Sequence, residues 1–232
     1  MAFSARKSDV MKKSLHKDTL DEKIYFHLYN FGVDKRVIFN DQEDYDRFEA
    51  YLYLLNAVES ARAANFFVPG REENIFNSAR GELLISIGAF SISSHDFHLI
   101  VSPEAESGIP KFMQKLQTAY TMYFNRKYPR EGSLFQSAYR SEDIHSDDEL
   151  KYFFAYVHLR PAQILSGYME PSALQFEELI SVARNYRYSS INEYTTEKFV
   201  ITSPRTFPKY FRTANPHTRL YSWFNKKNRL PA

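Results

Sequence analysis

The spacing of apolar residues along the chain changes between a period of two, typical of strands, and a period near 3.6, typical of helices. Alternating, aromatic-rich stretches predict four strands, at residues 23–31, 81–92, 97–102 and 134–144. Helical spacing predicts three helices, which run from the Asn40/Asp41 cap to about Leu55, over residues 109–128, and from the Asp147/Asp148 cap to about Leu159. We expect the last helix to end there because Arg160-Pro161 interrupts it. The order β-α-β-β-α-β-α predicts an α+β, ferredoxin-like fold, a split βαβ antiparallel sheet with an added helix.

Composition divides the chain into three parts. Residues 1–22 are polar and predict a flexible N-terminal arm, residues 23–168 hold the predicted fold, and residues 169–232 form a basic C-terminal extension with one predicted helix over 173–184. Seven Lys/Arg and no acid lie in 199–232, and five Lys/Arg and one acid in 1–17, which leaves 18 basic and 27 acidic residues between them. Contact with a polyanion is therefore expected to be local; alternatively, the basic ends only keep the protein in solution.

The absence of cysteine from the 232 residues excludes disulfide scaffolds, thiolate zinc sites, iron–sulfur clusters and cysteine nucleophiles. No apolar run reaches the length of a membrane span, and the N-terminus lacks the apolar block of a signal peptide. We therefore expect a cytoplasmic protein with no membrane partner. Aromatic residues make up 16% of the chain, enough both for a core and for stacking on a flat ligand.

A carboxylate and an imidazole begin the third predicted strand. Alternate side chains of a strand share a face, so Asp96 and His98 point together while His95 and Phe97 point the other way. Such a pair suits Mg²⁺ or Mn²⁺, whose ligands are mostly oxygens. The alternative is a polar strand start with a histidine that only makes structural hydrogen bonds.

The helix after Asp148 carries a tyrosine outside its apolar stripe. Leu150, Phe153, Phe154 and Val157 form the stripe expected to face the core. Tyr156 projects to one flank, with Arg160 one turn later. A tyrosine in this position is either a nucleophile, activated by the neighbouring cation, or a half-buried anchor.

Aromatic and basic residues alternate between positions 111 and 140, where six Lys/Arg stand against one acid. Aromatic faces beside cations are typical of surfaces that bind unpaired bases. The predicted nucleic-acid contacts are Lys111, Lys115, Tyr120, Tyr123, Arg126, Lys127 and Arg140. Alternatively, the tyrosines belong to the core and the cations to a solvated face.

The order and spacing of several segments resemble the HUH-type, single-tyrosine transposases of single-strand insertion sequences, nearest the REP-associated tyrosine transposases. These segments, between Tyr25 and Tyr194, are YNFGVDKRVIFNDQEDYDRF, SSHDFHLIV, GIPKFMQKLQTAYTMYFNRKY, GSLFQSAYRS, LKYFFAYVHLRPAQ and YRYSSINEY. The resemblance implies a ferredoxin-like fold and binding of single-stranded or hairpin DNA. It also implies cleavage of an adjacent single strand through a 5′-phosphotyrosine, assisted by Mg²⁺ or Mn²⁺, with a homodimer as a further expectation.

Carried over residue by residue, the family nucleophile falls on Tyr156, which opens Tyr156-Val157-His158-Leu159-Arg160-Pro161. The family metal pattern N-H-x-H-L places its second histidine at His98 and its first at Asp96. The third family ligand, an Asn or Gln four residues after the tyrosine, is replaced by Arg160, whose guanidinium cannot ligate a metal. The resemblance therefore assigns Asp96 and His98 to a metal, and Tyr156 with Arg160 to catalysis.

Two further family cations are missing. The family pattern N-R-G reads Asn30-Phe31-Gly32, and G-R-[YF]-[KR] reads Ser137-Ala138-Tyr139-Arg140. Together with Asp96 and Arg160, these departures indicate relaxed or redirected function. Three hypotheses follow: a transposase-like enzyme in which Arg160 supplies the missing charge, a domesticated nucleic-acid-binding protein without catalysis, or a remnant or assembly module that binds no DNA.

Overall fold

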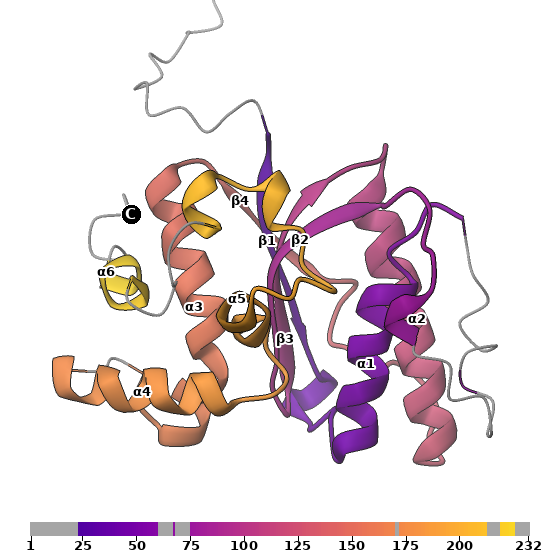
Figure 1. The fold of residues 1–232 in the computed structure, drawn as a ribbon. Coiled ribbons are helices and arrows are strands. Elements are labelled where there is room, and N and C mark those ends of the chain that lie inside the picture. The colour runs from indigo at the N-terminus through magenta and orange to yellow at the C-terminus, as the bar shows by residue number, and fades with distance from the viewer. Residues whose placement is uncertain (1–22, 60–66, 68–74, 170–171, 213–218, 226–232) are drawn as a thin grey trace, which may run out of the picture.

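The computed structural model describes residues 23–59, 67, 75–169, 172–212 and 219–225. The arm expected at 1–22 lies outside these residues, as do 226–232 at the end of the basic extension. The main elements are β1 (Tyr25–Phe31), α1 (Gln42–Leu54), β2 (Ile85–Ile92), β3 (Asp96–Pro103), α2 (Gly108–Lys127), β4 (Arg140–Ile144) and α3 (Asp147–Ser166) (Figure 1). They are followed by α4 (Ala173–Asn185), α5 (Ile191–Thr196) and α6 (Leu220–Phe224), and short 3-10 turns lie at Val33–Lys35, Ile75–Asn77, Pro204–Thr206 and Lys209–Phe211.

The sheet has four strands in the order β2-β3-β1-β4, and every neighbouring pair is antiparallel. This order, with α1 after β1 and α2 after β3, is the split βαβ arrangement, so the α+β, ferredoxin-like fold predicted from the sequence is confirmed. The added helix α3 follows β4 directly.

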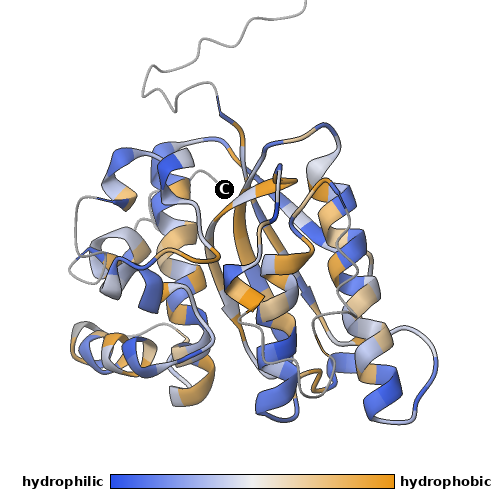
Figure 2. Cartoon of the chain, turned by 45° about the vertical axis from the view of Figure 1, so that its right-hand side comes forward, coloured by the Kyte–Doolittle hydropathy of each residue, from blue (hydrophilic) through white to orange (hydrophobic). Residues whose placement is uncertain are grey.

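Helices cover both faces of the sheet (Figure 1). The core beneath α1 and α2 includes Phe48, Phe97 and Phe112, whereas the core beneath α3 includes Ile100 and Phe154. Side chains alternate along β3, which is why Phe97 and Ile100 reach opposite cores. Figure 2 shows the strands largely hydrophobic between helices whose outer surfaces carry the hydrophilic residues.

Helix α1 begins as predicted, because the Asp41 side chain accepts a hydrogen bond from the backbone N–H of Asp44. The N-cap of helix α3 lies one residue before the predicted Asp147/Asp148 cap. Ser146 is its N-cap, and Ser146 and Glu149 bond each other's backbone N–H groups in a capping box.

Three predicted boundaries are wrong. The strand predicted over 81–92 begins only at Ile85. Helix α3 continues through Pro161 to Ser166, because Pro161, Ala162 and Gln163 are buried against neighbouring elements, and it ends where Gly167 adopts a left-handed conformation at φ 76°. The last strand covers only Arg140–Ile144 instead of 134–144, because the carbonyls of Ser137 and Ala138 accept side-chain bonds from Asn30 and not ladder bonds.

The C-terminal extension packs on the α3 side of the main fold. Helices α4 and α6 contact α3, and the backbone N–H of Ser203 donates to the carbonyl of Ile87 in β2. Phe207 lies over Gly88 of β2 and against Tyr25 of β1, at a ring distance of 5.1 Å. Among the described residues, none of the helices combines the length and the apolar composition that a membrane crossing needs.

Candidate active site

The α3-facing side of the sheet brings together side chains from β1, β3 and α3. Asp96 and His98 share this face of β3, as the alternation predicts, with 3.8 Å between Asp96 Oδ1 and His98 Nε2. Tyr156 and Arg160 of α3 lie over the same pair. The structure therefore brings together all four residues that the sequence analysis singled out here, although their chemical roles stay predictions.

Tyr156 contacts two imidazoles edge to face. Its ring centroid lies 5.4 Å from that of His98 and 5.8 Å from that of His27, with interplanar angles of 83° and 81°. The ring is half-buried, and no hydrogen bond among the described residues engages its hydroxyl. Burial raises the pKa of the Tyr156 phenol, while the positive charge of Arg160 opposes this rise. A phenol in this state needs a nearby base before it can act as a nucleophile.

The Arg160 guanidinium is fixed on the carboxylate. Its Nη2 donates a hydrogen bond to Asp96 Oδ2 at 3.0 Å. Burial alone would raise the pKa of Asp96, but the neighbouring His98 and Arg160 outweigh it and lower that pKa to about 2. Asp96 is therefore ionised at neutral pH, and Arg160 balances its charge.

Sequence reasoning missed His27, which completes the site from β1. Its Nε2 lies 3.0 Å from His98 Nδ1, and its Nδ1 lies 3.7 Å from Glu142 Oε2 on β4. Burial lowers the pKa of His27 to about 4, so the ring is neutral at pH 7. The alternation Tyr25, His27, Tyr29 along the predicted first strand was the signal that could have placed it on this face.

The donor set does not fit Mg²⁺ or Mn²⁺. One carboxylate and one imidazole face each other, and the third position is a guanidinium that already bonds Asp96 at 3.0 Å. Hard divalent cations need several oxygen ligands, and a fixed cation beside the carboxylate competes with them. In the part of the chain that the structure describes, no three His, Asp or Glu side chains are grouped so that they could hold a metal.

The residues predicted to contact nucleic acid divide into two groups. Lys111, Arg126 and Arg140 are exposed, and Lys115 is half-buried with its Nζ donating to the carbonyl of Ala57 at 2.7 Å. These four remain candidates for contact with a polyanion. Arg140 lies over the Phe31 ring, at 4.8 Å from its centroid.

One of the other three does not fit that role. Tyr120 is completely buried, and its hydroxyl donates to the carbonyl of Ile38 at 2.6 Å, so stacking on a base is excluded. Tyr123 and Lys127 are half-buried, and both donate to the buried carboxylate of Asp44, at 2.8 and 2.9 Å. Their polar groups thus join α2 to the start of α1, and their contact with nucleic acid stays a prediction.

Comparison with known proteins supports the family. Residues 66–160 match the model of the family described as "Transposase IS200 like". This segment runs through β2, β3, α2 and β4 and ends at Arg160, so it contains Asp96, His98 and Tyr156. The match confirms the resemblance to the single-tyrosine transposases for the segment that carries most of the site.

Two further comparisons complete this result. A solved structure of a REP-associated tyrosine transposase bound to a REP hairpin has a TM-score of 0.46 and 9% identity, over 82% of this chain and 90% of the other. Among curated proteins, none is similar in sequence to this chain. The placement nearest the REP-associated branch stays a prediction.

Proposed function

We propose that the protein binds single-stranded or hairpin DNA and cleaves and rejoins the strand through Tyr156. The observation that carries the proposal is the placement of the Tyr156 ring against His98, one helical turn from Arg160. The family match over residues 66–160 supports a transposase-like reaction. Exposed cations at Lys111, Arg126 and Arg140 support a polyanionic partner.

The reaction exchanges one phosphodiester for another. The Tyr156 oxygen forms a bond to phosphorus, and the bond from phosphorus to the 3′ oxygen breaks, which leaves a 5′-phosphotyrosine and a free 3′ hydroxyl. His98 accepts the phenolic proton and returns it to the leaving oxygen. Rejoining is the reverse reaction with a second 3′ hydroxyl.

Arg160 provides the fixed positive charge. Its Nη2 bonds Asp96 and its Nε is buried without a partner, so Nη1 is the nitrogen that can bind a phosphate oxygen while the bond to the carboxylate persists. A cation on the phosphate stabilises the charge that develops in the transition state, the contribution that the missing metal would have made. The reaction proposed for this chain therefore needs no divalent cation.

A second candidate function is binding without cleavage. The observation that favours it is the same ion pair, because a guanidinium held at 3.0 Å from Asp96 has partly satisfied its charge before any DNA arrives. A domesticated binding protein would then use the exposed cations, and Tyr156 would be only a half-buried anchor. A homodimer stays a prediction under either function.

A covalent adduct distinguishes these two candidates. The full chain is mixed with hairpin-flanked single strands that carry a label on the 3′ side of the hairpin, with and without EDTA, and separated on a denaturing gel. We expect a labelled adduct that is insensitive to EDTA and absent for Tyr156→Phe. Tyr152→Phe, a change one turn earlier on the same helix, is the matched control and is expected to keep the adduct.

Two results would contradict the cleavage proposal. Retention of DNA binding without any adduct across a broad set of strands would leave only the binding function. An adduct that survives in Tyr156→Phe would place the nucleophile elsewhere.

A further inference from the structure

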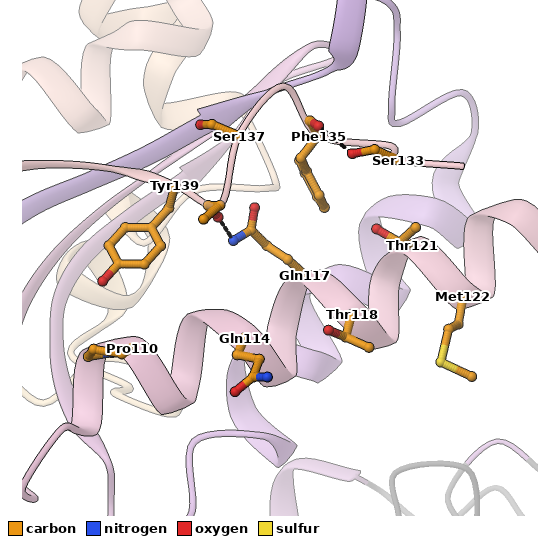
Figure 3. A pocket seen from close by; sticks show the side chains of 11 residues that line it. Pro110, Gln114, Gln117, Thr118, Thr121, Met122, Ser133, Phe135, Ser137 and Tyr139 are labelled. Atoms are coloured by element: carbon orange, nitrogen blue, oxygen red, sulfur yellow. Dashed lines mark hydrogen bonds between the residues drawn. The ribbon is translucent and has the colours of Figure 1, made fainter. Parts of the chain in front are cut away.

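A second site lies on the opposite side of the sheet from Tyr156. A pocket of about 550 Å³ separates the outer face of α2 from the segment 133–139 that leads into β4 (Figure 3). Its size is in the range of pockets that hold a small organic ligand. Gln114, Gln117 and Thr118 line it from α2, and Phe135 and Tyr139 line it from the segment.

Hydrogen bonds hold the two walls of the pocket, α2 and the segment 133–139, in place. The Gln117 amide accepts a hydrogen bond from Asn30 Nδ2 at 2.5 Å and donates one to the carbonyl of Ala138. Asn30 Nδ2 also donates to the carbonyl of Ser137 at 2.8 Å. Because Asn30 is completely buried at the end of β1, these bonds hold the segment and the helix at a set distance. The pocket is therefore formed before any ligand binds.

The groups that face the pocket are neutral and of mixed hydrogen-bonding type. Its lining residues include no Lys, Arg, Asp or Glu. Gln114 and Thr118 are exposed, and no hydrogen bond between described residues engages their side chains. An amide offers both donors and an acceptor, the combination with which side chains read the edge of a base. The ring of Tyr139 extends from the segment toward α2 and offers a flat face (Figure 3).

We propose that this pocket holds one unpaired base of the DNA strand whose phosphate lies at Tyr156, an inference that rests on the proposed function. A neutral heterocycle matches a pocket with an aromatic wall, the free amide of Gln114 and no charge, since bases are recognised by stacking and by hydrogen bonds to their edges. A phosphate or a charged peptide would instead require charged groups in the lining.

The start of β4 connects the pocket with the Tyr156 site on the other side of the sheet. Arg140 follows Tyr139 directly and pairs with Tyr29 in the β1–β4 register. The Tyr29 ring stacks on His98 at 5.3 Å, beside Tyr156. A strand that leaves Tyr156 thus passes the exposed cation of Arg140 before its next bases reach Tyr139. Cations outside the pocket suit the phosphates, and the neutral interior suits the base.

The residue at position 138 keeps the pocket open. Ala138 lies in its lining and is exposed. A methyl group leaves the space above Gln117 free, whereas a longer side chain would fill it. The short side chain at position 138 therefore keeps space for a base beside Gln117.

The experiment measures how substitutions in the protein and changes in the DNA affect binding, alone and in combination. The probe is a hairpin oligonucleotide with an unpaired 5′ flank, in which each flank nucleotide in turn is replaced by an abasic site. Affinities are measured by fluorescence anisotropy for the wild type and for Ala138→Leu. Gln114→Ala is the second variant, and Ser181→Leu, which adds the same side chain at an exposed position of α4, is the matched control.

We expect one abasic position to weaken binding to the wild type about tenfold, in line with the loss of one stacked base. Ala138→Leu should weaken binding of the intact probe by a similar factor and should be insensitive to that abasic position. Gln114→Ala should change which base is preferred there, and Ser181→Leu should behave as the wild type.

The outcomes separate the two proposals. Tight binding of the intact probe that neither the abasic series nor Ala138→Leu changes would overturn the base site and leave DNA binding standing. No binding of the intact probe by the wild type would overturn both.

Discussion

The side chains of Arg160 and Asp96 form a hydrogen bond of 3.0 Å between the last full turns of α3 and the start of β3. In the transposases that the chain resembles, an amide at the first position and a histidine at the second are metal ligands. Here a permanent cation and a carboxylate neutralise each other directly.

Replacing the cation by the family amide is expected to create a metal site. Arg160→Asn leaves Asp96, His98 and an amide oxygen together, a donor set that suits Mn²⁺. We expect calorimetry to show Mn²⁺ binding to Arg160→Asn and none to the wild type. The free energy of unfolding of the variant in the absence of metal should fall by about 2–3 kcal/mol, because the buried carboxylate of Asp96 loses its cation.

Arg160→Lys is the matched control for this experiment, since it keeps the positive charge and adds no ligand. It should bind no Mn²⁺. Binding of Mn²⁺ to the wild type that disappears in Asp96→Asn would contradict our interpretation of the ion pair.

Stability is expected to fall as the pH is lowered from 6.5 to 4 because of His27. Burial lowers the pKa of this imidazole to about 4, against 6.5 in the unfolded chain. Between these values the unfolded state binds a proton that the folded state does not, so the contribution is complete above pH 6.5 and is lost toward pH 4. It amounts to about 3 kcal/mol. Urea unfolding at several pH values measures it.

His27→Phe is the comparison, because a phenyl ring retains the packing and cannot be protonated. Its unfolding free energy should depend less on pH in this window. Asp96 contributes in a separate window, since its lowered pKa of about 2 gives stability that is lost only below about pH 4. An identical slope for His27→Phe and the wild type between pH 6.5 and 4 would contradict the assignment.

Sequence periodicity was sufficient for the fold and for half of the site. Alternation placed Asp96 and His98 together, and helical spacing placed Tyr156 off the core stripe, because both depend only on local geometry. The hydrogen bond between His27 and His98 depends on the register of β1 against β3, which no local pattern specifies. The same holds for Tyr120, whose burial depends on how α2 packs on α1.

Lys127 is expected to matter for stability and not for DNA. Its Nζ lies within 3.0 Å of carboxylate oxygens of Asp41, Glu43 and Asp44, and Asp44 is completely buried. Lys127→Met should lower the free energy of unfolding by about 2 kcal/mol, because a buried carboxylate loses its cation while its tyrosine partners remain. DNA affinity, measured by anisotropy, should be unchanged.

Arg126→Met is the matched change one residue earlier, at an exposed position. It should leave stability within about 0.5 kcal/mol of the wild type, as surface substitutions usually do. It should also weaken DNA binding and make it less dependent on salt, since one phosphate contact is lost. The reverse result, with Lys127→Met reducing DNA affinity at unchanged stability, would support the prediction made from the sequence, that Lys127 contacts nucleic acid.

Gly88 is expected to tolerate no side chain while Phe207 lies over it. A Cβ at position 88 would lie 2.5 Å from the Phe207 ring, and the β2–β3 register shifts at this residue. Gly88→Ala must therefore push Phe207 away from Tyr25, which we expect to lower the free energy of unfolding by about 1–3 kcal/mol. In a Phe207→Leu background the smaller side chain leaves room, so the same change should be less destabilising. Additive effects in the double variant, measured by urea unfolding, would mean that the extension does not pack on β2 as described.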